Sequence, residues 1–342
     1  MKLETLTLAP AQSAGEPETN LILTGFMATG KTAVGRAVAA RLGRPFVDMD
    51  TEIEARAGKP IPCIFAEEGE AAFRQMEAAL CRELAARSGL VIATGGGALV
   101  EEANRKLMMQ SGNVVCLVCS EDEILRRVQA EDGRERPLLD VPDPHAEIAR
   151  LLARRQPAYC AIPWWVDSTG LALEAVVERV AAFAGVVTLP VCSPGGRDGA
   201  EYCIHIGDGL LDQLGSALRA AGAPEGSRVA VVSNTVVAPL YGARAEAALQ
   251  AAGLAPFACT IPDGEAHKTL GTVAALYDQF LAGGLDRGDT VLALGGGVTG
   301  DIAGFTAASF MRGVRCAQAP TTLLAMTDSS VGGKTGVDLP QG

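Results

Sequence analysis

A glycine-rich segment near the start of the chain has the residue pattern of a phosphate-binding loop. Residues 25–32 fit G-x-x-x-x-G-K-[ST], after an apolar run at 21–26 and before an amphipathic stretch from about 31 to 42. Glycines let backbone N–H groups curl around phosphate oxygens, and the helix N-terminus adds a positive dipole. Lys31 would reach the β- and γ-phosphates, and the hydroxyl of Thr32 would ligate Mg²⁺. The pattern indicates a nucleoside triphosphate and leaves the acceptor open.

Carboxylates, arginines and a second glycine run follow this loop at the ends of expected elements. Asp48 and Asp50 lie one residue apart at the end of an expected strand over 45–49, on the same face of it. Phosphoryl transfer needs charge neutralisation and alignment more than covalent help, so paired carboxylates with arginines suit it. The other members are Arg74 in an expected helix, Gly95, Gly96 and Gly97 after a strand, Arg136 in the charged segment 130–144, and Arg155 near a helix end.

In order and spacing, these motifs resemble shikimate kinase over about residues 20–185. The resemblance implies phosphorylation of the shikimate 3-hydroxyl by ATP and Mg²⁺, with Thr32 and Asp48 holding the metal. Asp50 would bind the shikimate hydroxyls and take the proton of the 3-hydroxyl. Arg74 and Arg155 would grip the substrate carboxylate, which the guanidinium fork matches.

The remaining roles of this set also come from the resemblance. Gly95, Gly96 and Gly97 would let the backbone approach the shikimate ring, and Arg136 would stabilise phosphate charge when a lid over 130–144 closes. The implied catalytic residues are Lys31, Asp50 and Arg136. The implied ATP contacts are Gly25, Ala28, Thr29, Gly30, Lys31, Thr32 and Arg136.

One position departs from the family pattern. Many shikimate kinases have glycine where this chain has Ala28. Alanine resists positive φ, so we expect the loop to sit slightly differently without loss of activity. Arg126, Arg127 and Arg134 are of the right type to contact adenine or phosphates, but the sequence does not place them.

A second glycine-rich turn, at residues 295–301, again lies between an expected strand and an expected helix. Such a turn is a backbone site for a pyrophosphate, although it lacks the G-x-G-x-x-G form. Together with segments 262–268, 311–313 and 319–335, it resembles the amino-terminal half of 3-dehydroquinate synthase over about residues 188–342.

This second resemblance implies an NAD⁺ site and a site for a phosphorylated substrate. NAD⁺ would transiently oxidise a substrate hydroxyl, which makes phosphate elimination feasible. The implied NAD⁺ contacts are Asp263, Glu265, Lys268, Gly296, Gly297, Asp301, Thr321, Thr322 and Lys334. The implied substrate contacts are Arg312, Asp328 and Lys334, and the resemblance allows a homodimer through this half.

The synthase family also needs a divalent metal, Zn²⁺ or Co²⁺, held by one glutamate and two histidines in a carboxy-terminal helical domain. The histidines of this chain are His145, His205 and His267, and none has the family's downstream partners. We therefore expect the zinc ligands to be absent from this chain. Synthase activity is accordingly expected of a full-length parent protein and doubtful for residues 201–342.

The elements that must position these residues alternate between strand and helix in both halves. This rhythm predicts an α/β fold with parallel sheets covered on both faces: a P-loop kinase followed by a second α/β, NAD-binding domain. A length of 342 residues suits two domains. The expected organisation is a leader over 1–19, a kinase domain over 20–185, a linker over 186–200 and an incomplete NAD-binding domain over 201–342.

Composition excludes several other classes of protein. The net charge is −11 and neither half is basic, which argues against a nucleic-acid partner and leaves small-molecule substrates. No apolar run is long enough to span a bilayer, and the first twenty residues lack the apolar core of a secretory signal, so we expect a cytoplasmic protein without a membrane partner.

Three alternatives stay open at this point. Residues 20–185 could belong to another small-molecule P-loop kinase, such as a gluconate or nucleotide kinase. The second half could be a glycerol-dehydrogenase-like oxidoreductase, or a non-catalytic regulatory or dimerisation module. The pair Asp48 and Asp50 with Arg74 favours shikimate kinase, and the segment 328–335 favours the synthase.

Overall fold

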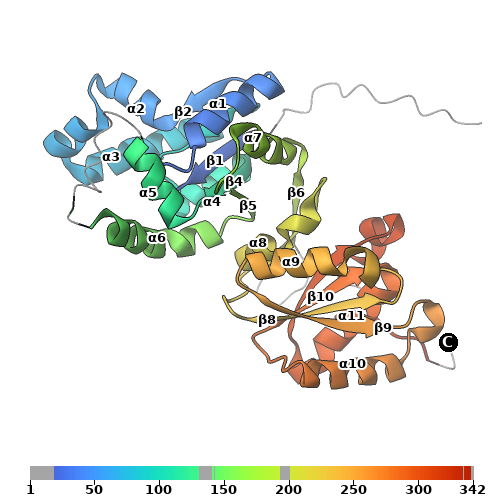
Figure 1. The fold of residues 1–342 in the computed structure, drawn as a ribbon. Helices are drawn as coiled ribbons and strands as arrows, with labels where there is room; N and C mark the ends of the chain where they lie inside the picture. Colours follow the sequence, from blue (N-terminus) through green and yellow to red (C-terminus); the bar gives the residue numbers. More distant parts are fainter. Residues whose placement is uncertain (1–18, 131–140, 142, 193–200, 334, 340–342) are drawn as a thin grey trace, which may run out of the picture. The chain divides into compact units, whose positions relative to one another are not determined.

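The computed structural model describes residues 19–130, 141, 143–192, 201–333 and 335–339. The chain divides into two compact units (Figure 1). The first unit comprises residues 1–145 and 168–184, and the second comprises 146–167 and 185–342. No helix in the described part of the chain combines the length and the apolar composition needed to cross a bilayer.

A five-stranded sheet has the order β2-β3-β1-β4-β5. Its strands are β1 (Asn20–Gly25), β2 (Phe46–Asp48), β3 (Val91–Ala93), β4 (Gly112–Val118) and β5 (Trp164–Asp167). β1 lies at the centre and pairs in parallel with β3 and β4, and every residue of β1 is buried. A strand covered on both faces is expected to be apolar throughout, and the sequence Leu21–Leu23 meets that requirement.

Helices follow the strands as the alternating pattern predicts. They are α1 (Lys31–Leu42), α2 (Met49–Ala57), α3 (Ile61–Ala85), α4 (Glu102–Ser111), α5 (Glu121–Ala130), α6 (Pro144–Cys160) and α7 (Leu173–Ala182), with a short turn, η2 (Phe183–Gly185). α1 packs against α7, and α4 packs against α3 and β4. α3 contains a break at Gly69, whose φ of 84° lies outside helical geometry.

The predicted strand over 45–49 is shorter in the structure, which changes the setting of Asp50. β2 ends at Asp48, and α2 begins at Met49. The Asp48 carboxylate accepts a hydrogen bond from the Thr51 N–H, so Asp48 is the N-cap of α2. Asp50 therefore lies in the first helical turn, and the expectation that both carboxylates share one strand face is wrong.

The second unit contains an antiparallel hairpin that the sequence analysis missed. β6 (Val187–Cys192) pairs with β7 (Glu201–Ile206) in the register Val187 to Ile206. The expected linker over 186–200 thus includes a strand. The prolines and glycines of this segment suggested a loop, whereas the branched and apolar residues between Val187 and Val191 suit a strand.

The main sheet of the second unit has the order β11-β10-β8-β9, and all of its pairs are parallel. The strands are β8 (Arg228–Asn234), β9 (Ala255–Ile261), β10 (Thr290–Gly295) and β11 (Arg315–Pro320). The helices are α8 (Leu214–Ala220), α9 (Ala243–Ala251), α10 (Leu270–Ala282) and α11 (Gly297–Ser309). Short turns lie at η3 (Leu210–Gln213), η4 (Ala238–Gly242), η5 (Glu265–His267), η6 (Phe310–Arg312) and η7 (Ala325–Ser329).

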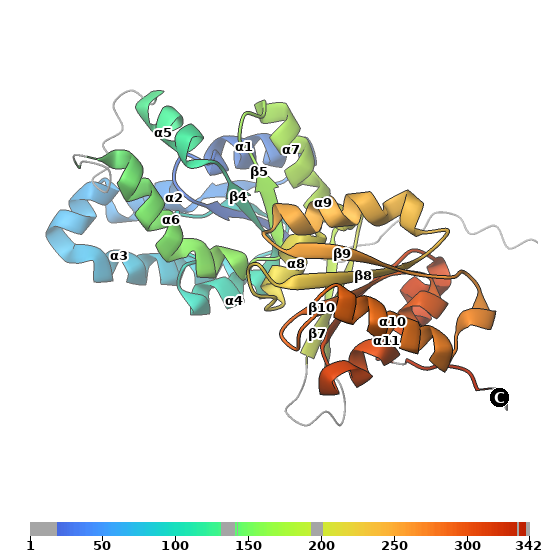
Figure 2. The same cartoon turned by 60° about the horizontal axis from the view of Figure 1, so that its bottom comes forward.

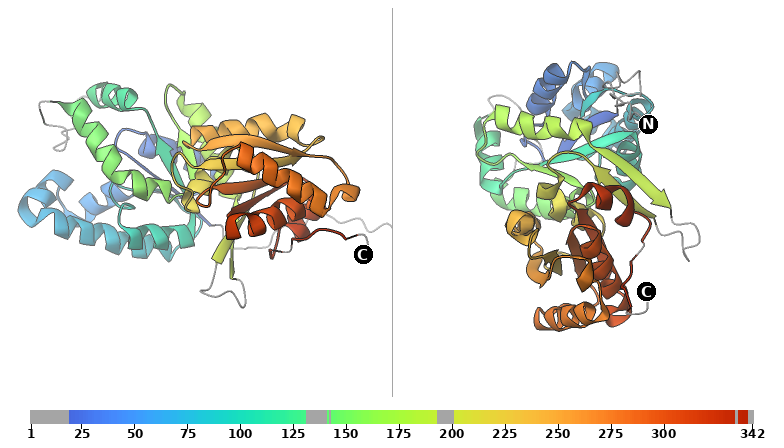
Figure 3. Two further views of the ribbon diagram at one scale, coloured as in Figure 1. Left: turned by 90° about the horizontal axis from the view of Figure 1, so that it is seen from below. Right: turned by 90° about the vertical axis from the view of Figure 1, so that its right-hand side faces the viewer.

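Alternate residues of β8 and β10 face two separate cores. Val229 and Val231 pack with Leu249 of α9 on one face, whereas Ala230 and Val232 pack with α10 and α11 on the other. Figure 2 shows α9 and α10 on opposite faces of this sheet, and Figure 3 shows α10 and α11 side by side. Both units are α/β with parallel sheets, which confirms the predicted fold class.

A glycine fixes the end of the central strand of the first unit. Gly25 has a φ of +135°, and a Cβ placed on it would lie 2.2 Å from the carbonyl oxygen of Leu117 in β4. We predict that Gly25→Ala lowers the free energy of unfolding of the first unit by about 2–4 kcal/mol, because strain and a backbone clash add. Gly43→Ala is the control, since Gly43 has a φ of +66° with nothing within 4 Å; it should cost about 1 kcal/mol.

Urea unfolding of both variants measures this difference. Hydrogen exchange at the β1 amides assigns the transition to the first unit. Equal losses for the two variants would show that the contact with Leu117 does not constrain the strand.

Candidate active site

The phosphate-loop pattern forms a turn between β1 and α1, at the carboxyl end of the central strand. Gly30 is the N-cap of α1 with a φ of 94°, and Ala28 also has a positive φ, 59°. The Thr29 hydroxyl and the Lys31 ammonium both donate to the carbonyl oxygen of Phe26, each at 2.8 Å. The loop thus closes on itself, with Ala28, Gly30 and Lys31 lining a cavity of about 370 Å³.

Oxygen donors suited to magnesium line the same cavity. The Thr32 hydroxyl donates to the Asp48 carboxylate at 2.6 Å, which joins the start of α1 to the end of β2. Thr94, at the end of β3, is buried and its hydroxyl has no hydrogen-bond partner among the described residues. Hydroxyl and carboxylate oxygens are the ligands that Mg²⁺ takes, often through water. The residues present therefore fit this ion.

Asp50 lies beside the glycine run that follows β3. A Cβ on Gly95 would lie 2.6 Å from Asp50 Oδ1 and 2.9 Å from Glu77 Oε1, so only glycine leaves room for both carboxylates. Asp50, Thr94 and Gly96 also line the cavity that holds the phosphate loop. The structure therefore brings Asp50 and the glycine run, which were predicted to bind the acceptor, next to the phosphate loop, which was predicted to bind the nucleotide.

Arg74 is held on α3 by two carboxylates. Its Nη1 donates to Glu77 at 2.6 Å, and its Nη2 donates to Glu70 at 3.0 Å. Burial lowers the pKa of Arg74, but the charges and hydrogen bonds of Glu77 and Glu70 raise it by more, so the guanidinium stays charged. A Cβ on Gly97 would lie 2.6 Å from Arg74 Nη1. Arg74, Asp50 and glycines 95–97 thus form one cluster.

Glu77 is the member of this cluster to which sequence reasoning gave no role. It is 1% exposed, and a buried carboxylate is costly unless it is paired. The three-residue spacing from Arg74 places both on one face of α3, and this spacing was the available signal. Glu77 therefore orients Arg74 and keeps one edge of its guanidinium occupied.

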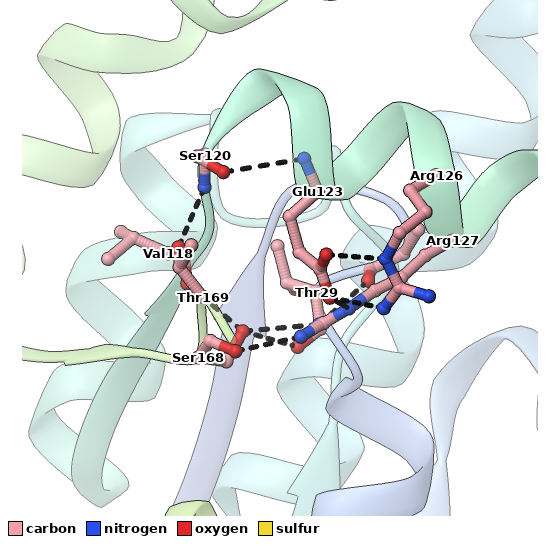
Figure 4. A network of polar contacts seen from close by, with 9 residues as sticks. Thr29, Val118, Ser120, Glu123, Arg126, Arg127, Ser168 and Thr169 are labelled. Atoms are coloured by element: carbon pink, nitrogen blue, oxygen red, sulfur yellow. Dashed lines mark hydrogen bonds and ion pairs between the residues drawn. The ribbon is translucent and has the colours of Figure 1, made fainter. Parts of the chain in front are cut away.

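Arg127 and Ser168 are a second addition from the structure. Figure 4 shows them beside the phosphate loop, with Arg127 on α5 and Ser168 just after β5. Arg127 donates to the carbonyl oxygens of Ala28 at 3.2 Å and of Ser168 at 2.7 Å. The arginine that the sequence could not place thus contacts the loop backbone.

The structure does not place three predicted features of the kinase half, namely Arg136, the lid and Arg155, with the other site residues. Arg136 and most of the expected lid lie outside the described residues. Arg155 is half-buried on α6, in the segment that belongs to the second unit. Their roles remain predictions.

In the second unit, the glycine turn after β10 forms the predicted cradle at a helix N-terminus. Gly296 is the N-cap of α11, and Thr321 donates its N–H to the Gly295 carbonyl. The Thr321 hydroxyl is buried without a hydrogen-bond partner among the described residues. An unpartnered donor beside a helix N-terminus at the carboxyl ends of parallel strands fits a dinucleotide pyrophosphate.

The other predicted NAD⁺ contacts lie after β9, on α11 and after β11. Lys268 forms an ion pair with Asp301 at 2.8 Å, and their hydrogen bond raises the pKa of Lys268. Asp263 accepts a hydrogen bond from Asn234 at 2.6 Å. Glu265 lines a separate cavity of about 400 Å³, together with residues at the start of α10. Thr322 lies 3.4 Å from the position of a Cβ on Gly296.

The predicted substrate contacts of this half are only partly described. Asp328 lies in η7, and Arg312 ends η6 with a positive φ of 70°. Lys334 lies outside the described residues. No group of three or more His, Cys, Asp or Glu side chains in the described ranges could hold a metal ion.

Comparison with known proteins assigns the two halves of the chain to different families, with residues 146–167 included in the first match. Residues 27–184 match the family model for shikimate kinase. The shikimate kinase of Burkholderia pseudomallei is 43% identical over 182 residues, which is 52% of this chain and 98% of that protein. The chain belongs to the shikimate kinase family. A solved structure of shikimate kinase from Acinetobacter baumannii in complex with shikimate is 39% identical, covering 47% of this chain and 90% of that one, with a TM-score of 0.45.

The second half of this shikimate kinase family member matches a different model. Residues 258–342 match the amino-terminal part of 3-dehydroquinate synthase. The 3-dehydroquinate synthase of Symbiobacterium thermophilum is 52% identical over 142 residues, and that of Bordetella pertussis is 51% identical over 152 residues. These matches cover 42% and 44% of this chain, and the chain spans only about two fifths of each synthase. The predicted joining of a kinase to a synthase-like segment is confirmed.

The Arg74 cluster yields a prediction that separates binding from folding. Arg74→Ala removes a charged hydrogen-bond donor, so the affinity for shikimate should fall by about one to two decades while ATP affinity holds. It also removes one ion-pair partner of the buried Glu77 carboxylate. Arg74→Lys keeps a charge beside Glu77 and loses the fork, so it should weaken shikimate binding with a smaller loss of stability.

Titration calorimetry with each substrate measures this prediction, and thermal unfolding reports the fold. Arg56→Ala is the control, because Arg56 pairs with exposed Glu83 on the same unit. Unchanged shikimate affinity in both Arg74 variants would remove Arg74 from the site.

Proposed function

We propose that the kinase half transfers the γ-phosphoryl group of ATP to the 3-hydroxyl of shikimate. One observation carries the proposal: Asp50 lines the same cavity as Lys31 and Thr32, and it adjoins Gly95 in the glycine run whose Gly97 lies beside Arg74. Membership of the shikimate kinase family supports the acceptor.

In this proposal each residue acts by position and charge. The new bond joins the 3-hydroxyl oxygen to the γ-phosphorus, the bond from that phosphorus to the β,γ-bridging oxygen breaks, and Asp50 accepts the hydroxyl proton. Lys31 turns from the Phe26 carbonyl toward the β- and γ-phosphates, a short swing of a flexible side chain. Arg74 would bind the shikimate carboxylate, and until it does so Glu77 holds its Nη1 while Glu70 holds its Nε and Nη2.

Magnesium would be held by Thr32 and Asp48. Bound there, it neutralises phosphate charge, which is the chemistry that this ion supplies to phosphoryl transfer. Asp48 also caps α2, so its carboxylate is oriented before any ligand arrives.

We predict shikimate-dependent ADP release that requires Mg²⁺, measured in a coupled assay on the whole chain. Lys31→Ala should lower turnover by about 10²-fold or more, the scale of losing one electrostatic contact to the transferred group. Lys106→Ala is the matched control, since Lys106 forms an exposed ion pair with Glu102 on α4 and does not line the cavity. Near wild-type turnover in Lys31→Ala would contradict the assignment of residues 25–32 as the phosphate-binding loop. A panel of acceptors that includes gluconate and nucleosides distinguishes shikimate kinase from other small-molecule kinases.

For the second half we propose binding of NAD⁺ at the cradle formed by Gly296 and Gly297, with Lys268 and Asp301 at its edge. The buried Thr321 hydroxyl, which has no hydrogen-bond partner within the described ranges, favours this site, as does the similarity to 3-dehydroquinate synthase. We further propose that a full-length synthase containing this half would turn over a phosphorylated substrate with Zn²⁺ or Co²⁺.

Titration of the whole chain with NAD⁺ tests this cradle. Gly297→Val should abolish binding, because a Cβ there already lies 3.1 Å from Ser329 Oγ and the branched side chain fills the space above the helix N-terminus. Gly288→Ala, with nothing within 4 Å, should bind like the wild type. Equal affinity in all three proteins would place NAD⁺ elsewhere.

A further inference from the structure

The phosphate loop contains a conformation that its own sequence disfavours. Ala28 has a φ of +59°, and the other non-glycine residues with positive φ in the described ranges are Met311 and Arg312. An L-residue in this region is strained, because its Cβ approaches the following carbonyl oxygen. Such a conformation persists only when neighbouring groups hold it.

Two consecutive carbonyls at this point are held from outside the loop. Arg127 Nη1 donates to the Ala28 oxygen at 3.2 Å and to Ser168 Oγ at 3.2 Å. The Ser168 hydroxyl lies 3.3 Å from the Thr29 oxygen and 3.2 Å from the Val118 oxygen, so its single proton is shared between these acceptors. Ser168 is 2% exposed, so water competes little for these bonds.

The holding residues are themselves fixed. Arg127 Nη2 donates to the Ser168 carbonyl at 2.7 Å, and Arg127 Nε donates to Glu123 at 2.8 Å (Figure 4). Glu123 also accepts two hydrogen bonds from Arg126, and together these bonds lower the pKa of Glu123 to about 2. At neutral pH the carboxylate is therefore ionised and anchors Arg127.

Peptide geometry connects these contacts to the phosphate site. A trans peptide is planar, with its C=O and N–H on opposite sides. A carbonyl of Ala28 held toward Arg127 therefore turns the N–H of Thr29 the other way, and the Thr29 carbonyl does the same for the N–H of Gly30. Ala28, Gly30 and Lys31 line the cavity, so N–H groups that turn away from Arg127 are available to a ligand bound there.

We propose that Ser168 and Arg127 are positioning residues for the phosphate loop: they hold the Ala28 and Thr29 carbonyls so that the next two N–H groups face the triphosphate. A glycine at position 28 would adopt this conformation without strain. In this chain, Ser168 and Arg127 instead hold Ala28 in it. This inference rests on the proposed kinase function. It adds to that function two residues, Ser168 and Arg127, which influence phosphate binding through the loop and do not contact the nucleotide themselves in this proposal.

The experiment is a double-mutant cycle between positions 28 and 168 in the whole chain. Ser168→Ala, Ala28→Gly and the double variant are titrated with MgATP, with inorganic tripolyphosphate and with shikimate. Ser168→Ala should weaken MgATP and tripolyphosphate binding alike, by about five-fold, the worth of an ordinary hydrogen bond. Shikimate affinity should hold, because the Arg74 cluster does not contact Ser168.

The cycle distinguishes positioning of the loop from a general structural role, because only positioning makes the effect of Ser168→Ala depend on the residue at position 28. A glycine adopts positive φ without strain, so the loss caused by Ser168→Ala should shrink to about two-fold or less in the Ala28→Gly background. Ser120→Ala is the matched control: its hydroxyl belongs to the same network and accepts from the Glu123 N–H, but it does not reach the loop. It should lower the melting temperature similarly and leave MgATP affinity unchanged.

Three outcomes would overturn the proposal. Equal losses from Ser168→Ala in the wild-type and Ala28→Gly backgrounds would show that the contacts do not support the strained residue. A loss for MgATP without a loss for tripolyphosphate would place Ser168 on the nucleoside side. A parallel loss of shikimate affinity would indicate general destabilisation. Failure of the proposed function is distinct, because the wild-type chain would then bind neither MgATP nor shikimate.

Discussion

The edge where parallel strands end is the constraint on which the first site depends. β1, β2 and β3 run in the same direction, so the residues that follow them emerge together. The phosphate loop follows β1, Asp48 ends β2, and Thr94 with the glycine run follows β3. Phosphate, metal and acceptor groups thus meet without any long loop to carry them. The close contact of Gly25 with β4 matters because a shift of β1 would move the loop away from the other two ends.

The first site contains fixed positive charges, although the chain as a whole is acidic. Two of the arginines at the first site are each held by carboxylates: Arg74 by Glu77 and Glu70, and Arg127 by Glu123. Such pairs keep long side chains in one conformation, so less entropy is lost when a ligand binds. They also explain how a protein with a net charge of −11 can offer fixed cations to polyanions.

Motif spacing predicted most of the fold and the membership of the first site, because glycine runs and apolar strands are short-range signals. It failed where tertiary contacts decide the outcome. The end of β2 depends on the Asp48 cap, and β6 depends on its pairing with β7, which no local pattern reveals. Ser168 was invisible because its role comes from residues 139 positions away in sequence. Glu77 was visible in the sequence, but its burial was not.

The near-contact between Gly97 and Arg74 has a consequence for engineering and for evolution. The guanidinium occupies the space that any side chain at position 97 would need, while Glu77 occupies the space beside Gly95. A change of acceptor therefore couples these positions: the Arg74 guanidinium must shift before a side chain fits at position 97, and replacing Arg74 removes one partner of the buried Glu77 carboxylate. A lineage or a designer seeking a substrate without a carboxylate would have to adjust positions 74, 77 and 97 with regard to one another, which slows gradual drift of the acceptor pocket.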